Sequence, residues 1–230
     1  STNAGFANKG QCDSVIVKYD SQGNQQWINN FGGSNLDYFK SVIETKDGEI
    51  VAVGYSYSTN AEFTSKGNGD AIIVKYDNEG NQLWVKNFGG SINDFFSSVI
   101  EMDDGNIVAV GYSSSKNAGF TNKGGSDAIV VKYDKNGRQQ WLKNFGGSGD
   151  DYFNSVIETR DKGIVVAGYS YSTNAGFANK GQCDAVIVKY DNEGNQEWIK
   201  NFGGTNTDCF YSVIETSDKG MVAVGYSWSE

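Results

Sequence analysis

The protein has 230 residues, of which 38% are hydrophobic and 13% aromatic, and it carries a formal net charge of −9 with a pI near 4.6. It has no histidine, which excludes Ser-His-Asp triads, Cys-His dyads and histidine metal sites, and it has no proline. The acidic balance makes a nucleic-acid backbone or an anionic membrane an unfavourable partner.

The sequence is built from four copies of one repeat. Tryptophans stand at Trp27, Trp84, Trp141 and Trp198, and each lies 57 residues after the one before it (84 − 27 = 57). We place the copies at 1–57, 58–114, 115–171 and 172–228, within a single domain that covers 1–230. A fixed period of this size predicts a repeat architecture and constrains the fold before any motif does.

Each copy predicts four short strands, which the second copy illustrates. Its β-rich runs are 71–76, 83–88, 95–101 and 107–112, and none has a helical period. The segments 77–80 and 103–105 predict tight hairpins, because their aspartates can cap the turn and their glycines can take positive φ. We expect both turns in every copy, with Gly163 and Gly220 as the glycines of the second turn in the last two copies.

The runs 71–76 and 107–112 are almost continuously apolar, so both of their faces should be covered. Small four-stranded antiparallel sheets that cover one another are the blades of a β-propeller, an all-β fold. We expect 95–101 to be the innermost strand, followed outward by 107–112, 71–76 and 83–88. A solenoid would leave two unprotected ends, and the sequence has no atypical capping copy.

Two motifs connect these copies to known propellers. The string Lys75-Tyr-Asp-x-x-Gly80-x-x-x-Trp84 resembles the blade motif of the PQQ-type propellers. With Phe88-Gly-Gly-Ser91-x-x-Asp94 and Val108-Ala-Val-Gly-Tyr112, the whole copy is similar to the bacterial SBBP-type propeller repeats. The resemblance covers all four copies and implies the fold, but propellers host unrelated functions. The cofactor-contacting residues of the quinoprotein members have no counterpart that we can place, so the resemblance does not imply a PQQ enzyme.

The phase of the repeat predicts how the ring closes. Residues 13–31 supply a third and an outer strand, while 209–227 supply an inner and a second strand. We therefore expect a propeller of four blades, the last one a composite of both termini. In this interpretation the repeat pattern of 226–229 continues in register into that of 1–3. One chain could therefore close its own ring, which favours a monomer. The alternative is a two-chain ring of eight blades, because identical elements exchange easily.

The long connections after the second strand share one face with the Gly-Gly-Ser-x-x-Asp connections, and this face is the candidate binding surface. One recurring loop set combines an amide, an aromatic ring and an ammonium group, which could together hold a sugar or an anionic group. In the alternative, phenylalanine fills the gap between blades while asparagine and lysine serve the turn. The set consists of Asn3, Phe6 and Lys9, then Asn60, Phe63 and Lys66, then Asn117, Phe120 and Lys123, and finally Asn174, Phe177 and Lys180.

Trp228 is the last ligand-binding candidate. It stands where the other copies have Tyr57, Ser114 and Tyr171. Because this position varies, we expect it to be exposed and to contact a ligand. Trp27 and its equivalents are expected to dock on the adjoining blade, and Tyr55, Tyr112, Tyr169 and Tyr226 to belong to the core.

Two carboxylate columns recur. Asp37, Asp94, Asp151 and Asp208 open the inner strands and could form an axial ring for a hard cation such as Ca²⁺. The alternative is that each accepts backbone N–H bonds from its own Gly-Gly-Ser turn. Glu44, Glu101, Glu158 and Glu215 stand seven residues later, roughly 20 Å away along a strand, which is too far for a glycosidase acid and base. We identify no catalytic residues.

These observations favour a non-enzymatic bacterial binding or scaffold propeller that presents repeated loops outside the cell or on its surface. A glycan is the ligand that we expect first. A protein partner or a passive spacer within a surface protein is the alternative, and a hydrolase is the least favoured interpretation. No cofactor is expected apart from the axial Ca²⁺, and the sequence shows no signal peptide. Cys12, Cys183 and Cys209 are expected to be tolerated small residues rather than a disulfide or metal framework.

Overall fold

The computed structural model describes residues 5–229, which form sixteen antiparallel strands. Over this range the chain has no helix that is long and apolar enough to cross a membrane. The strands are β1(Ser14–Tyr19), β2(Gln25–Phe31), β3(Asp37–Glu44), β4(Ile50–Ser56), β5(Asp70–Tyr76), β6(Gln82–Phe88), β7(Asp94–Glu101), β8(Ile107–Ser113), β9(Asp127–Tyr133), β10(Gln139–Phe145), β11(Asp151–Glu158), β12(Ile164–Ser170), β13(Asp184–Tyr190), β14(Gln196–Phe202), β15(Asp208–Glu215) and β16(Met221–Ser227).

The strands form three complete blades and two half-blades. Each complete blade is a four-stranded sheet in chain order, namely β3-β4-β5-β6, β7-β8-β9-β10 and β11-β12-β13-β14, and β1-β2 and β15-β16 are two-stranded sheets. The first strands of successive blades, β3, β7, β11 and β15, contact one another, so they are the inner strands. The expected strands and their order within a blade are therefore confirmed, and the fold is all-β and propeller-like.

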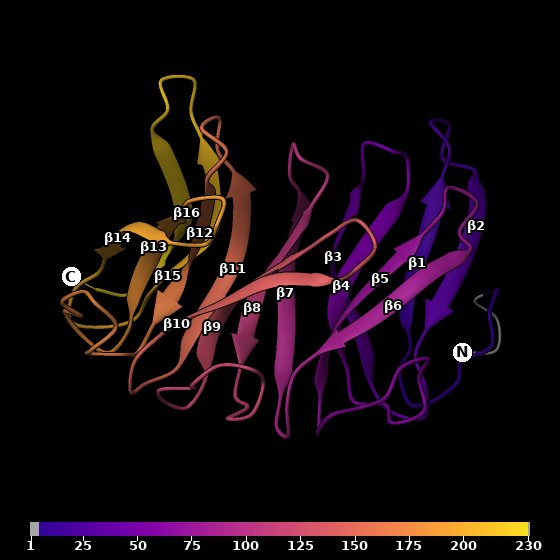
Figure 1. Cartoon of the computed structure of the whole chain (residues 1–230), viewed down its shortest axis with the longest axis horizontal. Helices are drawn as coiled ribbons and strands as arrows, with labels where there is room; N and C mark the ends of the chain where they lie inside the picture. Colours follow the sequence, from indigo (N-terminus) through magenta and orange to yellow (C-terminus); the bar gives the residue numbers. More distant parts are fainter. Residues whose placement is uncertain (1–4, 230) are drawn as a thin grey trace.

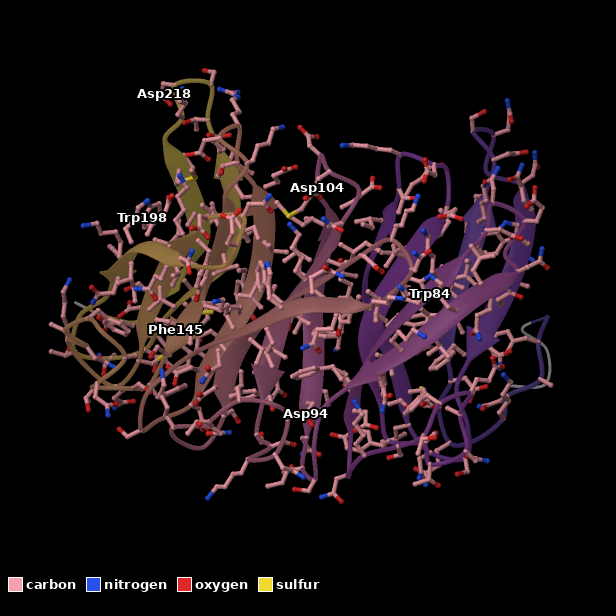
Figure 2. All side chains as sticks on the ribbon, viewed as in Figure 1. Trp84, Asp94, Asp104, Phe145, Trp198 and Asp218 are labelled. Carbon is pink, nitrogen blue, oxygen red and sulfur yellow. The ribbon has the colours of Figure 1, made fainter. Side chains whose placement is uncertain are left out.

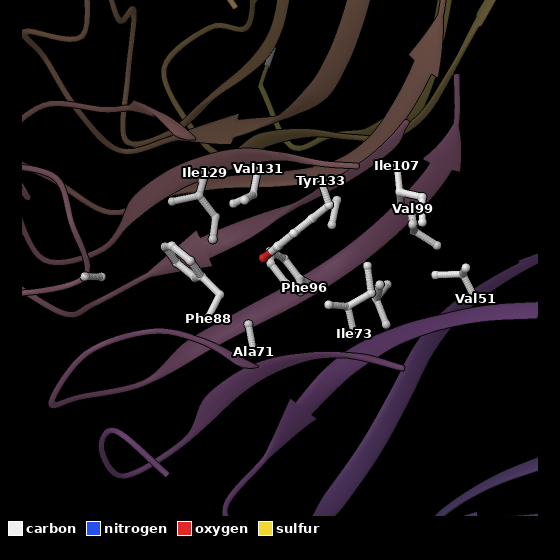
Figure 3. Packing of buried hydrophobic residues seen from close by; sticks show 13 residues of the cluster. Val51, Ala71, Ile73, Phe88, Phe96, Val99, Ile107, Ile129, Val131 and Tyr133 are labelled. Carbon is white, nitrogen blue, oxygen red and sulfur yellow. The ribbon is translucent and has the colours of Figure 1, made fainter. Parts of the chain in front are cut away.

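The core lies between blades rather than within them. In one cluster, Ile73 of β5 and Phe88 of β6 pack with Phe96 of β7 and Val131 of β9, which belong to the next blade (Figure 3). Ile72, the neighbour of Ile73 on β5, points the other way and joins a cluster with the β1-β2 half-blade. Successive side chains of a strand point to opposite faces, so a middle strand with neighbours on both sides needs a continuous apolar run.

The hairpins between third and outer strands form as expected. Asp77 accepts hydrogen bonds from the backbone N–H groups of Glu79 (3.0 Å) and Asn81 (2.8 Å), and Gly80 has a φ of 87°. A Cβ on Gly80 would also lie 2.8 Å from the ring of Trp27 on the preceding half-blade. This glycine therefore serves both the left-handed turn and the close approach of the neighbouring tryptophan.

The hairpins between inner and second strands depart from expectation in the last two copies. Gly48 and Gly105 take positive φ in the first two, but in the others the left-handed residues are Lys162 and Lys219, each with a φ of 67°. Gly163 and Gly220, which we expected there, lie one position later and do not have positive φ. The turn length is fixed by strand pairing, so the residue at the left-handed position adopts that conformation whatever its type.

The chain does not close on itself, which corrects the expectation of a composite blade from both termini. The β1-β2 and β15-β16 hairpins remain separate sheets, and they lie at opposite ends of the longest axis of the molecule (Figure 1). All four blade-to-blade junctions of a four-bladed ring are already present between these hairpins. Those junctions together turn the chain through less than a full circle, so its two ends stay apart.

The three cysteines are free. Cys183 and Cys209 are buried and Cys12 is half-buried. Cys12 and Cys183 form β-bridges to the residues that precede β3 and β15, and Cys209 lies within β15.

Candidate functional site

The structure separates the two kinds of connection as expected. Asp94 lies at one edge of the molecule, where the long connections gather, whereas Asp104 and Asp218, in the short hairpins, lie at the opposite edge (Figure 2). The surface with the long connections is called the loop face below.

On the loop face, the predicted loop residues are engaged by the protein itself. The Asn60 side-chain oxygen accepts a hydrogen bond from the Ser34 backbone N–H at 2.8 Å, and Asn117 and Asn174 do the same for Ser91 (2.8 Å) and Ser148 (2.7 Å). Each asparagine thereby ties its loop to the Gly-Gly-Ser connection that leads in from the preceding blade. Asn3 lies outside the described residues.

The phenylalanines of these loops fill gaps between blades. Phe63 stacks on Phe31 of β2 with ring centroids 6.3 Å apart, and Phe177 stacks on Phe145 of β10 at the same distance. Phe120 packs against the central cluster, and Phe6 is half-buried.

The lysines of the set serve the turns. The backbone N–H groups of Lys9 and Lys66 donate to Asp13 and Asp70 at 2.8 Å, and those of Lys123 and Lys180 donate to the equivalent carboxylates. The structure thus does not bring amide, ring and ammonium together as a ligand cradle, and their binding role remains a prediction.

The axial aspartates are also held within their own repeats. Asp94 is fully buried, and its carboxylate accepts hydrogen bonds from the Gly90 N–H (2.9 Å) and from the hydroxyls of Ser115 (2.8 Å) and Ser113. Asp37, Asp151 and Asp208 accept the same glycine N–H bond at 3.0 Å. Among residues 5–229, no group of three or more acidic or cysteine side chains is placed to hold a metal ion. The axial Ca²⁺ site remains a prediction.

Burial has an electrostatic consequence at these aspartates. Desolvation raises the pKa of Asp94 and Asp151 above the usual value, although the serine and glycine donors oppose that shift. At the open end, desolvation also acts to raise the pKa of Asp208. The hydrogen bonds from Ser227, Ser229 and Gly204 together outweigh that effect, so the pKa of Asp208 is lowered.

The glutamate column joins neighbouring blades. Glu101 at the end of β7 accepts a hydrogen bond from the Lys46 backbone N–H in the preceding blade at 2.7 Å. Glu158 and Glu215 accept equivalent bonds from Asp103 (2.7 Å) and Arg160 (2.9 Å). Within residues 5–229, the half-blade that precedes Glu44 has no inner hairpin, so Glu44 has no such donor. These residues are structural clasps.

The tryptophans dock on the following blade, as expected. The Trp27 indole N–H donates to the Asn78 carbonyl at 3.0 Å, and Trp141 donates to the Asn192 carbonyl at 3.2 Å. Both acceptors are in the hairpin of the next blade, so the outer strands are joined by a repeated contact.

The inner and second strands form a ladder of aromatic rings near the axis. Tyr55 of β4 contacts Phe95 of β7 with ring centroids 4.1 Å apart, and Tyr112 of β8 contacts Tyr152 of β11 at 4.6 Å. We call this set the axial aromatic ladder; it consists of Tyr38, Tyr55, Tyr57, Phe95, Tyr112, Tyr152, Tyr169 and Tyr171. The ladder continues separately at the open end through Tyr211, Tyr226 and Trp228.

A hollow of about 680 Å³ opens against this ladder. It is the most promising binding site of the described residues because rings and a few polar groups converge on one concavity. Its lining consists of Lys40, Tyr55, Tyr57, Asn93, Phe95, Phe96, Ser97, Tyr112, Asn154 and Tyr211. We call it the axial hollow.

The axial hollow carries a single cation on an uncharged aromatic wall. The Lys40 ammonium lies 5.5 Å from the ring centroid of Tyr55 and 5.9 Å from that of Tyr38, within cation–π range. Burial raises the pKa of Tyr55, Tyr57 and Tyr112 above the usual value, so these phenols stay neutral at physiological pH. The site therefore offers aromatic faces, hydroxyls and amides, with one positive charge.

Sequence reasoning missed the polar residues of the axial hollow. Lys40, Ser97, Asn154 and Tyr211 occupy the same repeat position, the fourth residue of each inner strand. The position differs in every copy although its neighbours hardly change, and that variation was the available signal. Trp228 is 72% exposed, as expected, and its ligand contact remains a prediction.

Comparison with known proteins gives distant relatives. No family model matches the chain. The regulatory protein FlaEY of Caulobacter vibrioides is 24% identical over 172 residues, which cover 68% of this chain and 18% of FlaEY. An uncharacterized WD repeat-containing protein of Acanthamoeba polyphaga mimivirus is 23% identical over 128 residues, which cover 50% of this chain and 9% of that protein. The chain thus spans less than a fifth of the length of either relative.

Comparison with solved structures gives chains that share little sequence with this one. A crystal structure of a eukaryotic initiation factor has a TM-score of 0.42 at 12% identity, covering 86% of this chain and 45% of that one. The structure of BamB from Moraxella catarrhalis has a TM-score of 0.28 at 12% identity, covering 91% and 75%. The fold assignment rests on the strand pairing described above.

Proposed function

We propose that the protein is a non-enzymatic interaction scaffold that binds a protein partner, through an extended peptide segment, in the axial hollow. The observation that carries this proposal is the aromatic ladder around a concavity whose four inner strands present different polar side chains. Aromatic rings give large contact area at low entropic cost, and the varied column supplies an asymmetric pattern that a unique partner can match. We place the protein outside the cell or at its surface, in keeping with the repeat type that it resembles.

Two further observations support a scaffold over an enzyme. Apart from Glu44, the recurring carboxylates of the inner strands are either buried against their own turns or engaged in joining blades, which leaves them without a free proton-transfer partner. The two curated relatives carry the descriptions of a regulatory protein and of a WD repeat-containing protein, and neither names a reaction. We carry over only the general role of an interaction scaffold.

Carbohydrate is the second candidate ligand. The observation in its favour is that the amides of Asn93 and Asn154 line the same hollow as the rings of Tyr55 and Tyr112. A sugar can stack on rings while its hydroxyls bond to amides.

Selection of a displayed peptide library on the purified chain, beside a glycan array, tests both ideas. We expect selected peptides whose affinity falls at least about tenfold in Tyr112→Ala and Lys40→Ala, by analogy with buried aromatic and cationic anchors. The matched control is Leu83→Ala, because Leu83 is exposed on the outer strand β6, away from the hollow. Binding of glycans without any selected peptide would favour carbohydrate as the ligand. An equal loss of peptide affinity in Leu83→Ala would refute the axial hollow as the binding site.

A further inference from the structure

The two half-blades are complementary parts of one blade. The β1-β2 hairpin has the sequence of third and outer strands, and the β15-β16 hairpin has that of inner and second strands. Because they lie at opposite ends of the arc (Figure 1), they cannot meet within this structure of the chain. We propose that two copies of the chain complete each other's fourth blade, β16 of one pairing with β1 of the other, in a closed ring of eight blades.

The pairing register follows from the complete blades. There, the second strand pairs with the third so that Ile50 faces Tyr76 and Ala52 faces Val74, and the other two complete blades repeat this alignment. Moving by whole repeats (50 + 171 = 221 and 76 − 57 = 19) places Met221 opposite Tyr19 and Ala223 opposite Val17 of the second copy. Both edges are unpaired within residues 5–229.

The two ends of the arc expose apolar side chains whose equivalents in the complete blades are buried. Val224 on β16 is 57% exposed, whereas the equivalent Val53 on β4 is 0% exposed. Val42 on β3 is 57% exposed, whereas Val99 on β7, which follows a complete blade, is 3% exposed. An unpaired strand edge beside exposed apolar side chains is a template for another strand.

A groove is ready for the incoming strand. It has a volume of about 330 Å³ and lies between β1 and β3, lined by Val15, Ile16 and Val17 on one side and by 39–42 on the other. In the complete junctions the second strand of one blade packs on the inner strand of the next, as β4 does on β7 and β12 on β15. The groove is the place where β16 of a second copy would make that contact on β3.

The clasps between blades are also divided between the two ends. Glu44 lacks the donor that Glu101, Glu158 and Glu215 have, and the donor that the repeat supplies is the Ser217 N–H of a second copy. At the other end, Trp198 has no following hairpin, and a Cβ on Gly23 would meet nothing within 4 Å, whereas Gly80, Gly137 and Gly194 each lie against a tryptophan.

A charge pair completes the match. Lys132 and Lys189 on the third strands pair with Asp104 (3.1 Å) and Asp161 in the inner hairpins of their own blades. The equivalent lysine of the half-blade is Lys18, and the equivalent aspartate is Asp218 in the other half-blade. Strand edge, apolar face, clasps and charge therefore all find their partners in a second copy, and two half-rings that each offer both ends close by two-fold symmetry.

The mass of the purified 230-residue chain in solution tests the ring. We expect twice 25.0 kDa by light scattering, and a single 25.0 kDa species in Val224→Lys, because the added ammonium would be buried in the completed blade. Circular dichroism of that variant should be unchanged. The matched control is Leu83→Lys, an exposed apolar residue of the outer strand, which should keep the doubled mass. A monomeric wild type, or an assembly larger than two chains, would overturn the proposal.

A cross-link tests the register independently of the mass. In a Cys12→Ser background, which follows Ser126 at the same repeat position, Val17→Cys with Ala223→Cys should give a disulfide-linked dimer under oxidation. Val17→Cys with Met221→Cys, two residues out of register on the same face, should give at least about tenfold less, because cysteines with Cα atoms more than about 7 Å apart do not bridge. Equal cross-linking of both pairs, or of neither, would contradict the predicted pairing.

Discussion

The carboxylate of Glu101 on β7 accepts a hydrogen bond of 2.7 Å from the backbone N–H of Lys46, a residue in the hairpin of the preceding blade. The bond recurs at the next two junctions, at 2.7 and 2.9 Å. It ties the tip of one blade to the end of the next inner strand, on the side opposite the loop face. Blade orientation is thus fixed by a polar contact as well as by the apolar core.

We predict that Glu158→Ala lowers the free energy of unfolding by about 1–2 kcal/mol, the range for a hydrogen bond to a charged group that is partly solvated. Glu158→Gln should retain part of the bond and lose less. Denaturant unfolding measures both. A loss as large in Glu158→Gln as in Glu158→Ala would contradict this prediction, because the neutral amide would then retain none of the bond.

Burial of Asp151 predicts a particular dependence of stability on pH. Desolvation raises its folded-state pKa, so the folded protein holds the proton more tightly than the unfolded chain. Its contribution is therefore largest below the usual value of 3.8 and declines as the pH rises through the folded-state pKa. Asp151→Asn does not titrate, so the stability of wild type relative to this variant should increase from about pH 7 to about pH 4.

Asp103→Asn is the matched control with the opposite sign. Lys162 and then Lys46 lower the pKa of Asp103 to about 2, so its contribution is present above 3.8 and is lost as the pH falls through the folded-state value. The stability of wild type relative to this variant should decrease on acidification. Urea unfolding at a series of pH values measures both differences. If the stability of wild type relative to each variant changed with pH in the same direction for both, burial would not be the cause at Asp151.

Lys219→Gly should stabilise the protein by roughly 0.5–1 kcal/mol. Lys219 has a φ of 67°, a conformation that costs a residue with a Cβ about 1 kcal/mol, and two copies of the repeat have glycine there. The gain is reduced by the larger entropy of glycine in the unfolded chain. An increase in the thermal midpoint checks this, and Gly105→Lys, the reverse change in another copy, should lower it.

Gly111→Ala should destabilise the protein by about 3 kcal/mol, the upper end of the range for overpacking. An added Cβ would lie 1.9 Å from the carbonyl oxygen of Phe95, at the point where a bulge between Phe96 and Ser98 bends β7 over β8. Gly176→Ala is the comparison, since its φ is 91° but nothing lies within 4 Å, so only the backbone cost of about 1 kcal/mol applies. Similar losses in both would place the effect in the backbone rather than in crowding.

The strands and their order were predictable because each depends on a local pattern that is repeated four times. Ile72, Ile73 and Val74 form an apolar run that only a strand covered on both faces accommodates, and Asp77 with Gly80 fixes the turn that follows. Ring closure was not predictable in the same way. It depends on the angle between blades, which arises from the summed packing of residues such as Phe88 and Phe96 rather than from any one motif.

The candidate site was only partly predictable. Recurrence directed attention to residues that every copy keeps, such as Asn60, Phe63 and Asp94, and these three residues have structural roles. The axial hollow is marked instead by Lys40 and Asn154, at a position where the copies differ. In a chain of near-identical repeats, the scaffold explains what is repeated, and a unique partner can be recognised only by what is not.

The near identity of the three complete second-to-third strand pairings also bears on how the chain reaches its structure. The edge of β4 that pairs with β5 would accept β9 or β13 in the same register, since each of those strands differs from β5 at a single residue. Discrimination among them comes from the chain, because the connection 57–69 that leads to β5 is much shorter than the chain that leads to β9 or β13, and the nearest contact forms first. Refolding should therefore give correct strand pairing in dilute solution. As the protein concentration rises, strands of neighbouring molecules compete on equal terms, and mispaired intermolecular species should increase.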